Sequence, residues 1–217
     1  KCDAIGSITL NSSVGGINAP AVEMAARDNC KLVWFPTCDS EHEMAHQFNG
    51  EPNKKLAFWA SIVIEMKNAG IKVPTINILD EFGQLKPEVY DVLDVIARYD
   101  LILATGHISH EEAYKLLHEA AKRNVKNILI THATFPTTFY SVEDQKKFID
   151  YGAKIEQCYT TWKTDKVAFD IVADQIRQVG PDNCILATDL GNTKLCYPDE
   201  GLAEFAERLL QKGFSED

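Results

Sequence analysis

The sequence predicts an α/β fold in which short parallel strands alternate with helices. Three observations support this prediction. Short apolar runs recur along the chain, a longer segment of helical periodicity follows most of them, and the runs are apolar on both faces, as in a parallel sheet covered by helices. Such repeated βα units form a parallel sheet that is either open or closed as a barrel, and the absence of a dinucleotide-binding motif favours a (β/α)8 TIM-barrel-like fold. Only six of the eight βα units are present, so the predicted barrel is incomplete.

The individual elements follow from these patterns. The predicted strands are Ile5–Leu10, Leu32–Phe35, Leu101–Ala104, Asn127–Thr131, Lys154–Cys158 and Cys184–Thr188. The predicted helices are Pro20–Arg27, Pro87–Arg98, Ser109–Arg123, Ser141–Tyr151, Asp165–Val179 and Asp199–Lys212. Proline in the first turn opens two of these helices, and serine followed by acidic residues opens two others. The loop after the first strand lacks the G-x-G-x-x-G of a dinucleotide-binding fold.

One region interrupts the alternation, at about residues 50–83. Within it, Leu56–Asn68 has the pattern of a helix and Val73–Leu79 that of a strand. We interpret the region as an elaboration between two βα units, because no linker or low-complexity tract marks a domain boundary. Residues 1–217 are therefore predicted to form a single barrel domain.

Composition narrows the classes of function. The chain has 217 residues, is 45% hydrophobic and 25% charged, and carries a formal net charge of −10. It has no cluster of Lys and Arg of the kind that binds nucleic acid or an anionic membrane, so neither is an expected partner. A small-molecule substrate is expected instead. The six cysteines are scattered and form no C-x-x-C, and no signal peptide is visible, which predicts reduced thiols in a cytoplasmic protein.

The ends of three predicted strands carry the strongest functional signal. His107 and His132 follow two of them and Asp189 follows the last. In a βα barrel the carboxyl ends of the strands form the active face, so these side chains should converge. Two imidazoles and a carboxylate suit Zn²⁺ or a similar divalent ion, and Asp189 could also accept a proton from water that the metal activates.

Other residues are weaker candidates. His42-Glu43-Met44-Ala45-His46 matches the H-E-x-x-H motif of zinc proteases, but the stretch is short and polar. His42 or His46 is alternatively a substrate contact at the rim of the barrel, or part of a solvated loop. His110, at the start of a helix, is a candidate for binding substrate or product. Glu156 is either a site residue or a paired internal charge. Three cysteines near predicted strand ends, Cys38, Cys158 and Cys196, are either zinc ligands or small core residues.

The chain resembles the metal-dependent hydrolases of the amidohydrolase superfamily, and within it a little-characterised bacterial branch. The resemblance rests on residues 18–23 (NAPAVE), 33–37 (VWFPT), 104–109 (ATGHIS), 130–132 (ITH) and 187–192 (ATDLGN). It implies a (β/α)8 barrel with His107, His132 and Asp189 in the metal site, and Asn192 beside the substrate. The superfamily's first strand ends in His-x-His, which this sequence lacks. We therefore expect that the first two strands are missing and that the open sheet edges favour a homo-oligomer.

These observations predict a metal-dependent hydrolase, at least in the full-length protein, that uses metal-activated water on an amide, lactone or ester. Two alternatives stay open. A non-catalytic metal- or ligand-binding barrel would follow if the missing His-x-His leaves the site incomplete. A lyase, such as a decarboxylase, would use the same site, because the superfamily also includes lyases.

Overall fold

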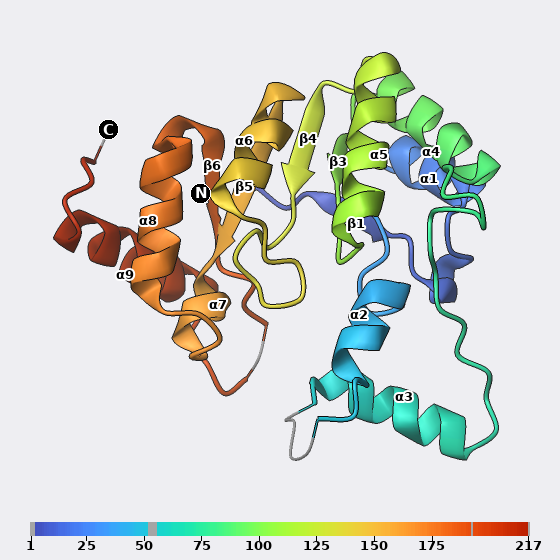
Figure 1. The fold of residues 1–217 in the computed structure, drawn as a ribbon, viewed down its shortest axis with the longest axis horizontal. Helices are drawn as coiled ribbons and strands as arrows, with labels where there is room; N and C mark the ends of the chain where they lie inside the picture. The colour runs from blue at the N-terminus through green and yellow to red at the C-terminus, as the bar shows by residue number, and fades with distance from the viewer. Residues whose placement is uncertain (1–2, 52–55, 192, 217) are drawn as a thin grey trace. The chain divides into compact units, whose positions relative to one another are not determined.

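We describe the protein from a computed structural model, which defines residues 3–51, 56–191 and 193–216. The chain divides into two compact units, residues 1–129 and 130–217. Its strands form a six-stranded sheet in the order β1-β2-β3-β4-β5-β6, and the neighbouring strands of each unit pair in parallel (Figure 1). The predicted parallel α/β fold is therefore present. No helix among the described residues is long and apolar enough to cross a membrane.

The first unit contains the beginning of the sheet and most of the helices. Its elements are β1 (Gly6–Thr9), the 3-10 turn η1 (Ser12–Val14), α1 (Ala19–Arg27), β2 (Cys30–Trp34), α2 (Glu41–Gln47), α3 (Phe58–Asn68), α4 (Pro87–Arg98), β3 (Ile102–Ala104), α5 (His110–Lys122) and β4 (Asn127–Ile130). Val33 of β2 pairs with Leu103 of β3, and both are fully buried. Helix α1 packs against α4 (Figure 1).

The second unit contains two strands, β5 and β6, and four helices among the described residues. Its elements are α6 (Val142–Asp150), β5 (Ala153–Cys158), α7 (Tyr159–Lys163), α8 (Phe169–Val179), the 3-10 turn η2 (Pro181–Asn183), β6 (Cys184–Ala187) and α9 (Pro198–Gln211). Trp162 lies at the centre of an aromatic cluster, with ring centroids 4.8 Å from Tyr159 and 5.0 Å from Phe169. Each large side chain buried in this way contributes about 1.5–3 kcal/mol, so the cluster fixes α7, and with it the end of β5, against α9.

Two element predictions are wrong. The predicted strand Val73–Leu79 is not a strand: Ile76 makes one isolated bridge to Ser40 and Leu79 one to Leu85. Its apolar residues anchor a loop instead, where Ile78 is fully buried and its amide donates to Glu112. The predicted helix Asp165–Val179 begins only at Phe169, because Asp165 has a left-handed φ of 56° that a helix cannot contain.

The cysteines agree with the prediction of free thiols. Those among the described residues are Cys30, Cys38, Cys158, Cys184 and Cys196, and none of these five is in a disulfide. The predictions of a single domain, of an elaboration at about residues 50–83 and of missing first strands stay predictions.

Candidate metal centre

His132 follows the carboxyl end of β4, where hydrogen bonds to its backbone hold it in place. The strand ends at Ile130, and His132 adopts a left-handed φ of 48°. Its carbonyl accepts hydrogen bonds from the amide of Phe135 at 2.8 Å and from the hydroxyl of Thr138 at 2.7 Å. A non-glycine residue in this conformation is strained by about 1–3 kcal/mol, and these bonds help to hold it. They turn the imidazole toward β5.

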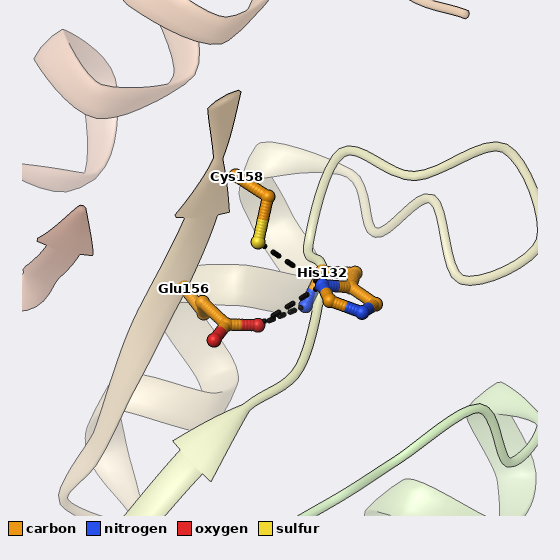
Figure 2. A group of neighbouring side chains, drawn as sticks. All are labelled: His132, Glu156 and Cys158. Carbon is orange, nitrogen blue, oxygen red and sulfur yellow. Dashed lines mark hydrogen bonds and ion pairs between the residues drawn. The ribbon is translucent and has the colours of Figure 1, made fainter. Parts of the chain in front are cut away.

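Two side chains of β5 meet this imidazole. Glu156 and Cys158 are two residues apart, so they project from the same face of the strand, as Figure 2 shows. The Nδ1 atom of His132 lies 3.1 Å from Glu156 Oε2 and 3.1 Å from Cys158 Sγ. Glu156 Oε2 also accepts a hydrogen bond from the backbone amide of His132 at 3.0 Å. The three side chains form one largely buried group within the second unit.

The side chains of this group shift one another's pKa values. Burial opposes the charged form of His132, but the hydrogen bond and charge of Glu156, with a further contribution from Asp189, raise its pKa. Burial likewise acts against the charged form of Glu156, but its bonds to His132 lower its pKa. Both shifts favour an imidazolium facing a carboxylate. Burial raises the pKa of the Cys158 thiol well above its ordinary value, and the charges of Glu156 and Asp189 act in the same direction.

The donor set of this group fits a divalent metal ion. One nitrogen, one oxygen and one sulfur ligand atom lie within 4.8 Å of one another. Ligand atoms bound at about 2.0–2.3 Å to one zinc ion lie roughly 3–4 Å apart. The distances between these side chains are close to that range, and imidazole, carboxylate and thiolate are the ligands that zinc takes in proteins.

Asp189 belongs to the same unit and contributes charge. It follows β6, has a left-handed φ of 52°, and is exposed. One of its carboxylate oxygens accepts a hydrogen bond from the hydroxyl of Thr160 at 2.9 Å. The amide of Thr160 in turn donates to the carbonyl of Thr188 at 3.2 Å. These two bonds hold the carboxylate beside the end of β5, where its charge acts on His132. Asn192, a predicted substrate contact, lies outside the described residues.

His107 lies in the first unit, at the end of β3. The preceding Gly106 has a φ of 64°, and a Cβ atom there would come within 2.2 Å of the carbonyl oxygen of Phe35. The glycine therefore allows the turn to approach the end of β2. The amide of His107 then donates to Pro36 at 2.9 Å, and its carbonyl accepts from Ser40 Oγ at 2.6 Å. Its Nδ1 lies 3.4 Å from the buried carboxylate of Glu43.

This contact also bears on the H-E-x-x-H motif. Helix α2, which carries the motif, is only seven residues long. Glu43 is buried against His107, whereas His42 and His46 are partly exposed. Within the described residues these three side chains form no group with a third metal ligand. The arrangement differs from the long half-buried helix of a zinc protease and leaves His42 and His46 at the surface of α2.

The remaining candidate, His110, is the first residue of α5 and is partly exposed. Ser109 caps this helix in a reciprocal capping box with Glu112. The capping box therefore fixes where α5 begins and places His110 in its first turn. Its predicted role in binding substrate stays a prediction.

The sequence makes Glu156 and Cys158 candidates one by one but does not predict that they form a group with His132. The signal that could have found them is their spacing. They occupy alternate positions of the strand that follows His132, and in a parallel sheet consecutive strands are usually neighbours. A buried carboxylate needs a partner, and His132 is the partner of Glu156.

Two solved structures that are similar to this chain are described as amidohydrolases. An amidohydrolase from Pseudomonas aeruginosa matches with a TM-score of 0.51 and 13% identity over 97% of this chain and 73% of that protein. An amidohydrolase from Burkholderia multivorans matches with a TM-score of 0.46 and 11% identity over 98% of this chain and 77% of that protein. The first likeness shows the fold and confirms the predicted TIM-barrel-like α/β architecture.

The sequence comparisons place the chain in a family. No curated protein matches it. A family model does, over residues 1–156, which is most of the chain and includes β1 to β4 and Glu156 of β5. The chain thus belongs to DUF6282, a family of unknown function.

Proposed function

We propose that this chain is the metal-binding part of a hydrolase that uses water to cleave an amide, lactone or ester. The observation that carries the proposal is the largely buried group of His132, Glu156 and Cys158, which lie just after β4 and in the second half of β5 and whose ligand atoms are within 4.8 Å of one another. Ligands gather at the carboxyl ends of the strands in folds of this kind. The fold shared with an amidohydrolase adds support.

His132 and Asp189 are the proposed metal ligands in the second unit. His132 offers an imidazole nitrogen once the ring has lost its proton, and Asp189 offers an exposed carboxylate whose charge acts on that imidazole. The sequence predicts His107 as a further ligand, and that role stays part of the proposal. A zinc or similar divalent ion would polarise the substrate carbonyl and lower the pKa of a water molecule toward neutrality.

Asp189 is also the proposed general base. Its carboxylate is exposed and holds one hydrogen bond, from Thr160, so it keeps capacity to accept a proton from water. Thr160 keeps the carboxylate in place while the proton is accepted. His42, His110 and Asn192 are proposed substrate contacts. We also propose that the substrate is a small molecule and that the protein is cytoplasmic.

The experiment is a screen of amide, lactone and ester substrates with the zinc-loaded chain and with the longest natural form of the protein. We expect hydrolysis that a chelator abolishes and added Zn²⁺ restores. His132→Asn should remove the activity, since asparagine tolerates the left-handed backbone of His132 but is a poor zinc ligand. His118→Asn, on the exposed side of α5, is the matched control.

Two results would redirect the proposal. Zinc binding without turnover of any substrate would favour the non-catalytic metal-binding alternative. Release of carbon dioxide from a carboxylate substrate, in place of hydrolysis, would favour the lyase alternative.

A further inference from the structure

We propose that Cys158 is a metal ligand and that its thiolate, with Nδ1 of His132 and the carboxylate of Glu156, selects a thiophilic divalent ion such as Zn²⁺. All three donors lie in the second unit. The inference deepens the proposed function, on which it rests for the presence of a metal. It adds Glu156 and Cys158 to the ligands and thereby names the class of ion.

The argument begins with the positions of the three donor atoms. Sγ of Cys158 and Oε2 of Glu156 each lie 3.1 Å from Nδ1 of His132. All three atoms lie within 4.8 Å of one another. Ligand atoms bound to one zinc ion at about 2.0–2.3 Å are separated by roughly 3–4 Å. One ion can therefore bind all three atoms after small shifts of side chains that already face one another (Figure 2).

Strand β5 supplies both of the added donors. Glu156 and Cys158 occupy alternate positions of the strand and so project from the same face. Their exposed fractions are 5% and 1%, so the surrounding residues hold them in place. Ligands on a strand are positioned more precisely than ligands on a loop. The spacing therefore presents one oxygen and one sulfur donor to the imidazole from a rigid element.

The competing interpretation makes Cys158 a small core residue, as many buried cysteines are. Its sulfur, however, contacts a ring nitrogen and belongs to a group with a carboxylate. Burial and the negative charges of Glu156 and Asp189 raise the pKa of the Cys158 thiol, so the metal-free side chain keeps its proton. A divalent cation reverses this balance, because it attracts the carboxylates and the thiolate alike.

Metal binding exchanges protons for the ion and involves no oxidation. The S–H bond of Cys158 breaks as the metal–sulfur bond forms, and its proton goes to water. A nitrogen of His132 binds the ion only without a proton, so any proton on Nδ1 goes to water too. Thiolate ligands favour zinc, whereas Mg²⁺ and Mn²⁺ are better suited to oxygen ligands. The sulfur of Cys158 therefore sets which ion the site prefers.

The first experiment uses Co²⁺ as a spectroscopic probe of the full chain. The wild type with bound Co²⁺ should show a strong thiolate-to-metal charge-transfer band, and Cys158→Ser should lose it. Cys184→Ser is the matched control, because Cys184 is a partly buried thiol of β6 in the same unit. It should keep the band. A wild type without the band, or a band that survives in Cys158→Ser, would overturn the proposal.

The second experiment measures Zn²⁺ affinity by competition with a chelating indicator. Loss of a partner behind a ligand typically costs about 10–100-fold in metal affinity, so loss of the ligand itself should cost Cys158→Ser about 100-fold or more. Cys158→Ala, which adds no hydroxyl, is measured beside it, and circular dichroism checks that each variant is folded. Glu156→Gln should weaken Zn²⁺ binding but keep the Co²⁺ band. Wild-type affinity in Cys158→Ser would overturn the proposal.

Metal preference and turnover complete the test. The wild type should prefer Zn²⁺ to Mn²⁺, and Cys158→Ser should show a smaller preference. Zn²⁺ bound through Cys158 without hydrolysis of any amide, lactone or ester would reject the proposed function and support the ligand assignment. Hydrolysis by Cys158→Ser at the wild-type Zn²⁺ affinity would support the proposed function and overturn the ligand assignment.

Discussion

Glu156 holds His132 at two points, because one carboxylate oxygen lies 3.0 Å from the backbone nitrogen and 3.1 Å from the ring nitrogen of the same residue. Single contacts of this kind leave a side chain free to rotate. Two contacts to one residue fix both its backbone and its ring. The left-handed turn at His132 and the carboxylate of Glu156 therefore hold each other in place. A substitution at either residue should change the position of the other.

The pH dependence of folding should reveal this pair. The pKa of Glu156 is lowered from its ordinary value of 4.5, so its contribution to stability is present above that value and is lost as the pH falls through the folded-state pKa. The pKa of His132 is raised from 6.5, so its contribution is complete below that value and is lost as the pH rises through the folded-state pKa. The pair should stabilise the chain most between about pH 4.5 and 6.5.

Urea denaturation of the metal-free chain across this range provides the measurement. The wild type should exceed Glu156→Gln by about 2 kcal/mol in the window, a typical value for a hydrogen bond to a charged group. The difference should shrink toward both ends. A difference that stays constant from pH 4 to pH 9 would show that the two groups do not titrate as a pair.

Gly106 should be the most sensitive glycine at the site. Gly106→Ala places a Cβ atom 2.2 Å from the carbonyl oxygen of Phe35 and 2.6 Å from that of Pro36, in a left-handed backbone. We expect a loss of about 3 kcal/mol or more in the free energy of unfolding. Gly152→Ala is the matched control, because Gly152 has a φ of 83° with nothing within 4 Å of a Cβ atom. It should lose only about 1 kcal/mol; equal losses would argue against the close approach at Gly106.

The surface histidines of α2 should not hold the metal. We expect the double variant His42→Ala, His46→Ala to keep the zinc content of the wild type, since Glu43 is buried against His107 and α2 is seven residues long. If His42 contacts substrate, turnover should fall while zinc stays bound. Loss of zinc in the double variant, measured by elemental analysis, would revive the zinc-protease hypothesis.

Association through β6 is a further expectation. β6 is an outermost strand in the sheet order, and Ile185 within it is 44% exposed. Such edges pair readily with other chains. Ile185→Lys should lower the mass found by light scattering, whereas Leu202→Lys, at a site on α9 that is 43% exposed, should leave it unchanged. A wild type that is monomeric at all concentrations would contradict the expectation.

Much of the fold could be predicted because its elements follow local rules. Apolar runs such as Asn127–Thr131 and proline-led segments such as Pro87–Arg98 correspond closely to β4 and α4. The segment Val73–Leu79 has the composition of a strand but forms a loop with two isolated bridges, and only packing decides between the two structures. Composition cannot show that Ile78 is needed to fill the core beside Glu112.

The candidate site was predictable in part for a similar reason. His132 and Asp189 stand at strand ends, which the alternation of strands and helices locates. The role of Glu156 depends on the direction in which His132 turns, and that direction follows from a left-handed φ of 48°. Such a conformation is uncommon outside glycine, and even asparagine, aspartate and histidine adopt it only in a minority of cases, so no sequence pattern indicates it.

The most direct test of the central claim is an equilibrium Zn²⁺ titration of the metal-free chain by calorimetry. The account predicts one strong site in the wild type, its loss in His132→Asn, marked weakening in Asp189→Asn, and no change in His118→Asn. Bound zinc should also raise the free energy of unfolding, by about 2.7 kcal/mol when free zinc is a hundred times its dissociation constant. Wild-type and His132→Asn chains that bind zinc equally would contradict the claim that His132 is part of a metal centre.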